Sequence, residues 1–80
     1  MSSNVKLNEL KGKMRAEGHT LRSLAPKIGM SIATLSLKLN GLSDFTSTEI
    51  FAICNELHID YKDIGKYFFP QMFPKETLSA

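Results

Sequence analysis

The sequence has few of the residues that covalent and metal chemistry require. Its 80 residues include one cysteine and two histidines. One cysteine cannot form an internal disulfide, which favours a reducing cytoplasm. No Cys/His group has metal-site spacing, and no glycine pattern forms a phosphate-binding loop. We therefore expect no catalytic residue, metal, cofactor or small-molecule ligand, and the protein is not expected to be an enzyme.

The individual candidates for such chemistry favour structural roles. His19 precedes a helix cap, and His58 lies at the end of a predicted helix, where a cation suits the helix dipole. Cys54 lies on the apolar face of that helix without a nearby basic partner, which indicates a buried, inert thiol.

Long apolar runs are also missing. No stretch approaches the roughly 18–20 residues of a membrane span, and the N-terminus lacks a signal-peptide layout. We expect no membrane association. The length predicts one domain with a modest core. Residues 1–70 are assigned to it and residues 71–80 to a C-terminal tail.

The net charge of +2 hides an uneven distribution. Residues 1–40 contain seven Lys and Arg against two Glu, and residues 41–80 contain three Lys against six Asp and Glu. A basic half is typical of a surface that faces a polyanion, although solvated helices also carry lysines.

Hydrophobic spacing and capping residues predict five helices and no strand. The first spans about residues 5–17 and ends at Gly18. Thr20 caps the second, and Gly29 provides the tight turn after it. The third helix is capped by Ser31, and it extends to Asn40 before Gly41.

The last two helices have clear N-terminal signals. Thr46 and Glu49 form a capping box for the fourth, whose expected core residues are Ile50, Ile53, Cys54 and Leu57. Asp60 caps the fifth, in which Tyr61, Ile64 and Phe68 are expected to point inward. Pro70 and Pro74 then end regular helix.

The third helix presents a candidate contact surface. Leu35 and Leu39 should face the core, so five other side chains point outward: Ile32, Ala33, Ser36, Leu37 and Asn40. The polar ones, with Thr34, can donate to bases or phosphates, whereas the apolar ones can only touch thymine methyl groups. Ile32 and Leu37 would otherwise be partly buried in the core or bind a protein.

Residues 20–36, Thr-Leu-Arg-Ser-Leu-Ala-Pro-Lys-Ile-Gly-Met-Ser-Ile-Ala-Thr-Leu-Ser, resemble the helix-turn-helix of the phage Cro and CI repressor superfamily. The segments Lys-Leu-Asn-Gly (38–41), Phe-Thr-x-x-Glu-Ile (45–50) and Tyr-Phe-Phe (67–69) resemble a smaller set of short phage and prophage regulators. The resemblance implies an all-α, compact five-helix, lambda-repressor-like DNA-binding domain. Its helix-turn-helix lies at about residues 20–40, and it is usually dimeric on operator DNA.

The resemblance and the outward positions predict a DNA-binding set of residues, and the large apolar residues near the end of the sequence predict a dimerisation set. The DNA-binding set is Thr20, Leu21, Arg22, Ser31, Ile32, Ala33, Thr34, Ser36, Leu37, Lys38 and Asn40. The dimerisation set, chosen because one short helix cannot bury so many large apolar residues, is Phe68, Phe69, Met72 and Phe73.

The chain departs from its relatives at three places. Many relatives have a buried Arg–Glu ion pair where this chain has Met14 and Leu39. Because both partners are replaced, no buried charge is left without a partner. Pro26 predicts a kink in the second helix or a late start. Ile32 and Leu37 replace polar side chains that relatives often direct at bases.

The leading functional hypothesis is a small phage-type, Cro-like or repressor-like, transcriptional regulator. It would bind an operator in double-stranded DNA as a homodimer in the cytoplasm of a bacterial host. The alternative is a modulator or antirepressor that keeps the fold and binds a partner repressor protein through Ile32 and Leu37.

Overall fold

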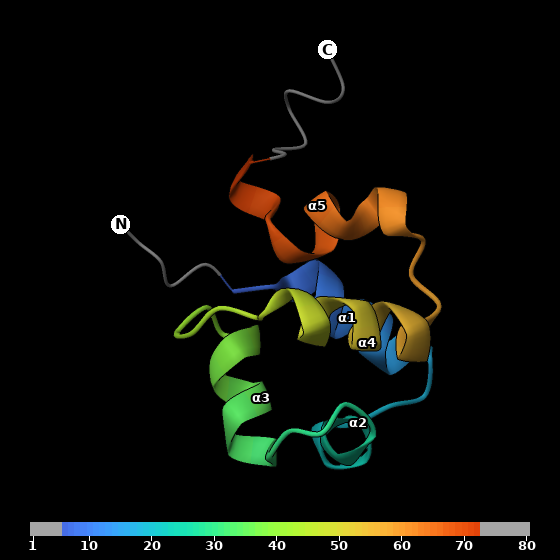
Figure 1. The fold of residues 1–80 in the computed structure, drawn as a ribbon, viewed down its shortest axis with the longest axis vertical. Helices are drawn as coiled ribbons and strands as arrows, with labels where there is room; N and C mark the ends of the chain where they lie inside the picture. The colour runs from blue at the N-terminus through green and yellow to red at the C-terminus, as the bar shows by residue number, and fades with distance from the viewer. Residues whose placement is uncertain (1–5, 73–80) are drawn as a thin grey trace.

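The computed structural model describes residues 6–72, which form five α-helices and two 3₁₀ turns (Figure 1). The α-helices are α1 (Asn8–Ala16), α2 (Leu21–Lys27), α3 (Ile32–Leu39), α4 (Ser47–Leu57) and α5 (Ile64–Phe68). The 3₁₀ turns are η1 (Tyr61–Asp63) and η2 (Pro70–Met72). The described residues contain no strand, so the predicted all-α, five-helix architecture is confirmed.

In this arrangement α1 and α4 lie between the α2–α3 pair and α5 (Figure 1). α2 packs against α3, α1 contacts α3 and α5, and α4 contacts α5. None of the helices in residues 6–72 is both long and apolar enough to span a membrane. The core is one cluster of buried apolar side chains: Leu7, Leu10, Met14, Leu24, Ala25, Leu35, Leu39, Ile50, Ile53, Cys54, Leu57, Ile59 and Phe68.

Helices α1 to α4 are each followed, within two positions, by a residue in the left-handed conformation. Gly18, Gly29, Gly41 and His58 have φ values of 81°, 71°, 79° and 59°. After each of them, the next backbone N–H donates to the carbonyl five positions earlier at 2.9–3.0 Å, as in a Schellman motif. Glycine adopts this conformation at little cost, which is why three of these turns were predictable and the turn at His58 was not.

The predicted N-caps are also present. Ser31 caps α3, and Thr46 forms the expected capping box with Glu49 at the start of α4. Thr20 caps α2 in a second box, in which Ser23 takes the place that Glu or Gln usually occupies. These caps fix where α2, α3 and α4 begin.

Two parts of the chain differ from the prediction. Asp60 accepts a hydrogen bond from the Lys62 N–H at 3.2 Å, but it opens the 3₁₀ turn η1, and α5 begins only at Ile64. Tyr61, which was predicted to point inward, is 56% exposed because the 3₁₀ turn rotates it out of the α-helical register. At the other end, α1 begins at Asn8, and Val5 lies outside the described residues.

Pro26 does not delay the start of α2. The helix begins at Leu21, directly after its Thr20 cap, so the predicted late start is wrong. Pro26 occupies the last turn, one residue before the helix ends at Lys27. The missing N–H therefore removes a single helical hydrogen bond, the one that the Arg22 carbonyl would accept.

Candidate nucleic-acid interface

Helix α3 has an exposed outer face and a buried inner face. Ile32 and Leu37 are 40% and 47% exposed, whereas Leu35 between them is fully buried. α2 supports the inner face through its own buried residues, Leu24 and Ala25. The predicted outward direction of Ile32 and Leu37 is thus confirmed, and the alternative that they belong to the core is wrong.

The outer face of α3 offers more methyl groups than hydrogen-bond donors. Ala33 is exposed, and Ser36 is half-buried. The hydroxyl of Ser31 accepts from the Thr34 N–H at 3.1 Å and donates to Thr34 Oγ1 at 2.9 Å. Because Ser31 is committed to this cap, direct base readout by α3 would rest on apolar contacts and on the hydroxyls of Thr34 and Ser36.

The start of α2 is less open to a ligand than its sequence indicated. Thr20 Oγ1 accepts from the Ser23 N–H at 3.2 Å, and Ser23 Oγ accepts from the Thr20 N–H at 2.9 Å. Thr20 was among the predicted DNA-binding residues, and both its hydroxyl and its backbone N–H are used inside the cap. Leu21 is half-buried and packs against the core. Arg22 is exposed, so it is the predicted α2 residue whose charge remains at the surface.

Lys38 does not belong to the outer face of α3. Its Nζ lies 2.7 Å from Glu49 Oε1 and 5.9 Å from the centre of the Phe45 ring, and its side chain is only 11% exposed. The Lys38 hydrogen bond, followed by that of the Thr46 N–H, lowers the pKa of Glu49. Lys38 therefore ties α3 to α4, which corrects its prediction as a DNA contact.

Helices α1 and α3 meet at a cavity of about 180 Å³. Lys11 and Arg15 of α1 line it together with Ser36 and Asn40 at the end of α3. Lys11 Nζ donates to Asn40 Oδ1 at 2.7 Å, so Asn40 is held from α1. Neither cation was among the predicted DNA-binding residues. The signal that could have found them is their spacing of four residues in the basic half of the chain.

Two apolar side chains also line the cavity. Met14 and Leu39 are both buried, and both line the cavity. Because both side chains are apolar, neither position leaves an unpaired charge in the core. The Leu7 N–H donates to the Leu39 carbonyl at 2.9 Å, which is a further link between α3 and the segment before α1.

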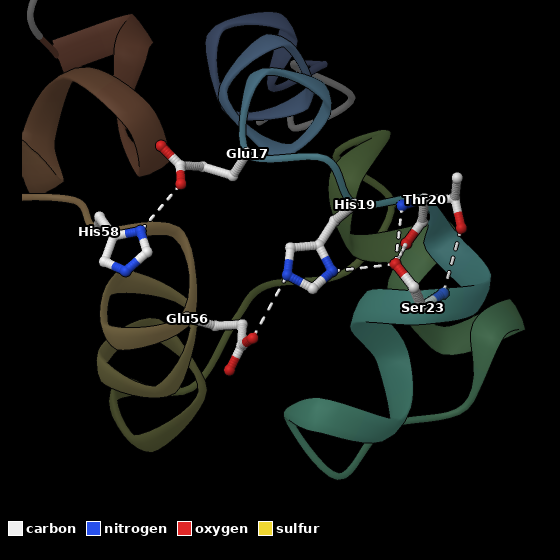
Figure 2. Close-up of polar contacts among 6 residues, drawn as sticks. All are labelled: Glu17, His19, Thr20, Ser23, Glu56 and His58. Carbon is white, nitrogen blue, oxygen red and sulfur yellow. Dashed lines mark hydrogen bonds and ion pairs between the residues drawn. The ribbon is translucent and has the colours of Figure 1, made fainter.

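Two histidine–glutamate pairs hold the α1–α2 connection against α4 (Figure 2). His19 Nε2 lies 3.3 Å from Glu56 Oε2, and its Nδ1 lies 2.9 Å from Ser23 Oγ in the α2 cap. His58 Nδ1 lies 2.8 Å from Glu17 Oε1. Both histidines thus lie in links between helices, in agreement with the structural roles expected for them.

In residues 6–72 no three His, Cys, Asp or Glu side chains are grouped so that they could hold a metal ion. Cys54 is buried in α4, and this burial raises the pKa of its thiol. A raised pKa disfavours the reactive thiolate.

The predicted dimerisation residues are separated by the fold. Phe68 is buried and meets the Phe45 ring edge-on, with centroids 5.5 Å apart, so it belongs to the core of one chain. This corrects its prediction as a dimer contact. Phe69 and Met72 are 39% and 70% exposed. Phe73 lies outside the described residues.

Lowering the pH from 7 to 3 should reduce the free energy of unfolding of wild-type protein more than that of a Glu17→Gln variant. The hydrogen bond from His58, and next that from Lys13, lower the pKa of Glu17 from its ordinary value of 4.5. A lowered pKa stabilises the fold above pH 4.5, and this contribution is lost as pH falls through the folded-state pKa. The variant has no such contribution to lose, so the two proteins should converge in acid.

Urea unfolding of both proteins between pH 7 and pH 3 measures this convergence. Because Glu17 is near the surface, the difference at neutral pH should be small. A wild-type advantage of the same size at pH 7 and pH 3 would contradict the role given to the Glu17 carboxylate.

One family model matches residues 4–71, which is most of the chain. Its description is a protein of unknown function, DUF739. None of the curated protein sequences matches the chain significantly. The description states no activity or ligand, so a function has to be argued from the residues themselves.

Proposed function

The chain belongs to the DUF739 family of proteins of unknown function, and we propose that this member is a DNA-binding transcriptional regulator of the phage Cro and CI repressor type. In this proposal the α2–turn–α3 unit is a helix-turn-helix, and α3 lies in the major groove. The regulator works in the cytoplasm of a bacterial host, where a chain bound at its operator blocks RNA polymerase.

The observation that carries the proposal is the junction of α1 with the outer end of α3. There Lys11 and Arg15 share a cavity with Ser36 and Asn40. Positive charge therefore lies directly beside the face of α3 that would meet DNA. Contacts with phosphates supply most of the affinity of non-specific DNA binding, and they set the register of the protein on the duplex.

Exposed side chains of α2 and α3 supply the remaining contacts in this proposal. Arg22 and Lys27 are exposed cations of α2 and are suited to flanking phosphates. Ile32 and Leu37 contact thymine methyl groups, while the Thr34 hydroxyl donates to a base edge. With so few polar groups on α3, we expect modest sequence specificity on top of phosphate binding.

Fluorescence anisotropy with a labelled generic duplex tests the proposal directly. The expected result is binding at low salt that weakens at moderate salt and is competed by heparin. A sample that is folded and helical by circular dichroism but does not bind at low salt would overturn the DNA-binding proposal.

The second candidate, a modulator that binds a partner repressor, is favoured by the exposed Ile32 and Leu37. Apolar side chains of this size are typical anchors of protein interfaces, which depend little on salt. Under this alternative, an Ile32→Ser/Leu37→Ser variant loses partner binding and keeps any binding to generic DNA. Leu42→Ser is the matched control, because Leu42 is exposed but lies beyond the end of α3.

We further propose that the regulator forms a homodimer through Phe69 and Met72. These two residues lie close together because the Met72 N–H donates a hydrogen bond of 2.9 Å to the Phe69 carbonyl at the turn η2. A Phe69→Ser/Met72→Ser variant should sediment as a monomer under conditions in which wild type is a dimer. Truncation before residue 69 is unsuitable, since it would remove or expose Phe68 of the core. Equal sedimentation coefficients for variant and wild type would contradict this interface.

A further inference from the structure

The cavity between α1 and α3 brings two cations together without an acidic neighbour. Lys11 and Arg15 are four residues apart, which places them on one face of α1. Both line the cavity, and its lining contains no Asp or Glu. Within residues 6–72 Arg15 forms no ion pair. Two like charges at this spacing repel each other, so an anion bound between them would relieve a repulsion.

Two neutral donors of α3 complete the polar side of the cavity. Ser36 lies on α3 and Asn40 directly follows it, and both line the cavity together with the two cations. Lys11 Nζ donates to Asn40 Oδ1 at 2.7 Å. Because an ammonium group can only donate, this bond fixes the amide with its oxygen toward Lys11 and leaves the amide NH₂ as a donor. The polar groups around the cavity therefore offer mainly N–H and O–H donors.

The remaining wall of the cavity is apolar. It consists of Met14, Leu21 and Leu39. The volume of about 180 Å³ is roughly six times the share of one liquid water molecule, which is about 30 Å³. A phosphodiester fits this combination, because its charged oxygens lie next to the apolar C–H groups of deoxyribose. A bare anion would fill only the polar side.

We propose that Lys11 and Arg15 of α1, with Ser36 and Asn40 of α3, form a phosphate-binding site in this cavity. The inference rests on the proposed function: the phosphate belongs to the DNA backbone beside the groove that α3 enters. It makes α1 a third DNA-contacting element next to α2 and α3. No residue of α1 was predicted from the sequence to have this role.

The test compares wild type with a Lys11→Gln/Arg15→Gln variant in DNA anisotropy titrations at several salt concentrations. Losing one phosphate contact should reduce the slope of log K against log salt by about 0.9. At 0.1 M salt this corresponds to about eightfold weaker binding, taking 1 M salt as the reference. Arg15→Gln alone serves if the double variant is unfolded, since it leaves the Lys11–Asn40 hydrogen bond in place.

The matched control is Lys62→Gln/Lys66→Gln, which removes the same charge from η1 and α5, at the far end of the molecule from α2 and α3 (Figure 1). The site predicts little change in its salt slope. If both double variants reduce the slope equally, only net charge matters, and the proposed site is wrong. An unchanged slope in the Lys11/Arg15 variant overturns it as well.

Titration with inorganic phosphate separates this site from the proposed function. It is followed by the NMR signals of the Asn40 side-chain amide, with sodium chloride at matched ionic strength as the control. Should wild type not bind DNA, a saturable phosphate-specific shift that Arg15→Gln abolishes would support the site for free phosphate. The absence of any such shift in that case would overturn the site too.

Discussion

Replacing Leu35 by alanine is expected to lower the free energy of unfolding by about 2–5 kcal/mol, the range measured for buried leucines. Leu35 is fully buried on α3, where it packs in the core with residues of α1, α2 and α4. A small domain of this kind is typically stable by only about 5–15 kcal/mol, so much of the margin would be lost. Urea unfolding followed by circular dichroism measures the change.

Leu37→Ala is the matched control for this prediction. It removes the same atoms from the same helix two residues further on, but Leu37 is 47% exposed. We expect its free energy of unfolding to stay within about 0.5 kcal/mol of wild type. Equal destabilisation by the two variants would contradict the division of α3 into a buried face with Leu35 and an exposed face with Leu37. The proposal that the exposed face of α3 contacts DNA would then have no support.

Affinity for duplex DNA is expected to fall about 40-fold per protomer between 50 and 200 mM salt. Three phosphate contacts give this value: one in the α1–α3 cavity and one each from Arg22 and Lys27, with a combined slope of about −2.7. Lys13 and Lys38 are left out because they pair with Glu17 and Glu49 at 3.2 and 2.7 Å. A homodimer with two identical half-sites would double the slope.

The individual contacts can be separated by single substitutions. Arg22→Gln should reduce the salt slope by about 0.9, because it removes one exposed cation in the first turn of α2. Lys38→Gln should leave the slope nearly unchanged, since Lys38 is committed to Glu49. Its effect should appear as lower stability of the α3–α4 contact. Binding whose slope is near zero would exclude a phosphate-driven mechanism and favour the partner-protein alternative.

The sequence by itself determined the helices and most of their ends. The caps Thr20, Ser31 and Thr46 and the turn residues Gly18 and Gly29 act within one helical turn, so their effects can be read from neighbouring residues. The inward and outward faces of α3 follow from helical periodicity in the same way. The short 3₁₀ turn η1 was missed because the same cap residue, Asp60, suits either type of helix.

Only the tertiary structure decided which charges and aromatic rings are available to a partner. Lys38 was assigned to DNA until α4 placed Glu49 beside it, 11 residues away in sequence. Phe68 was assigned to a dimer until the loop before α4 placed Phe45 against it. Lys11 joined the candidate interface only because α1 packs next to the end of α3, 29 residues away at Asn40. Caps and periodicity act over three to five residues, whereas ion pairs and cavities depend on helices that meet only after the chain has folded.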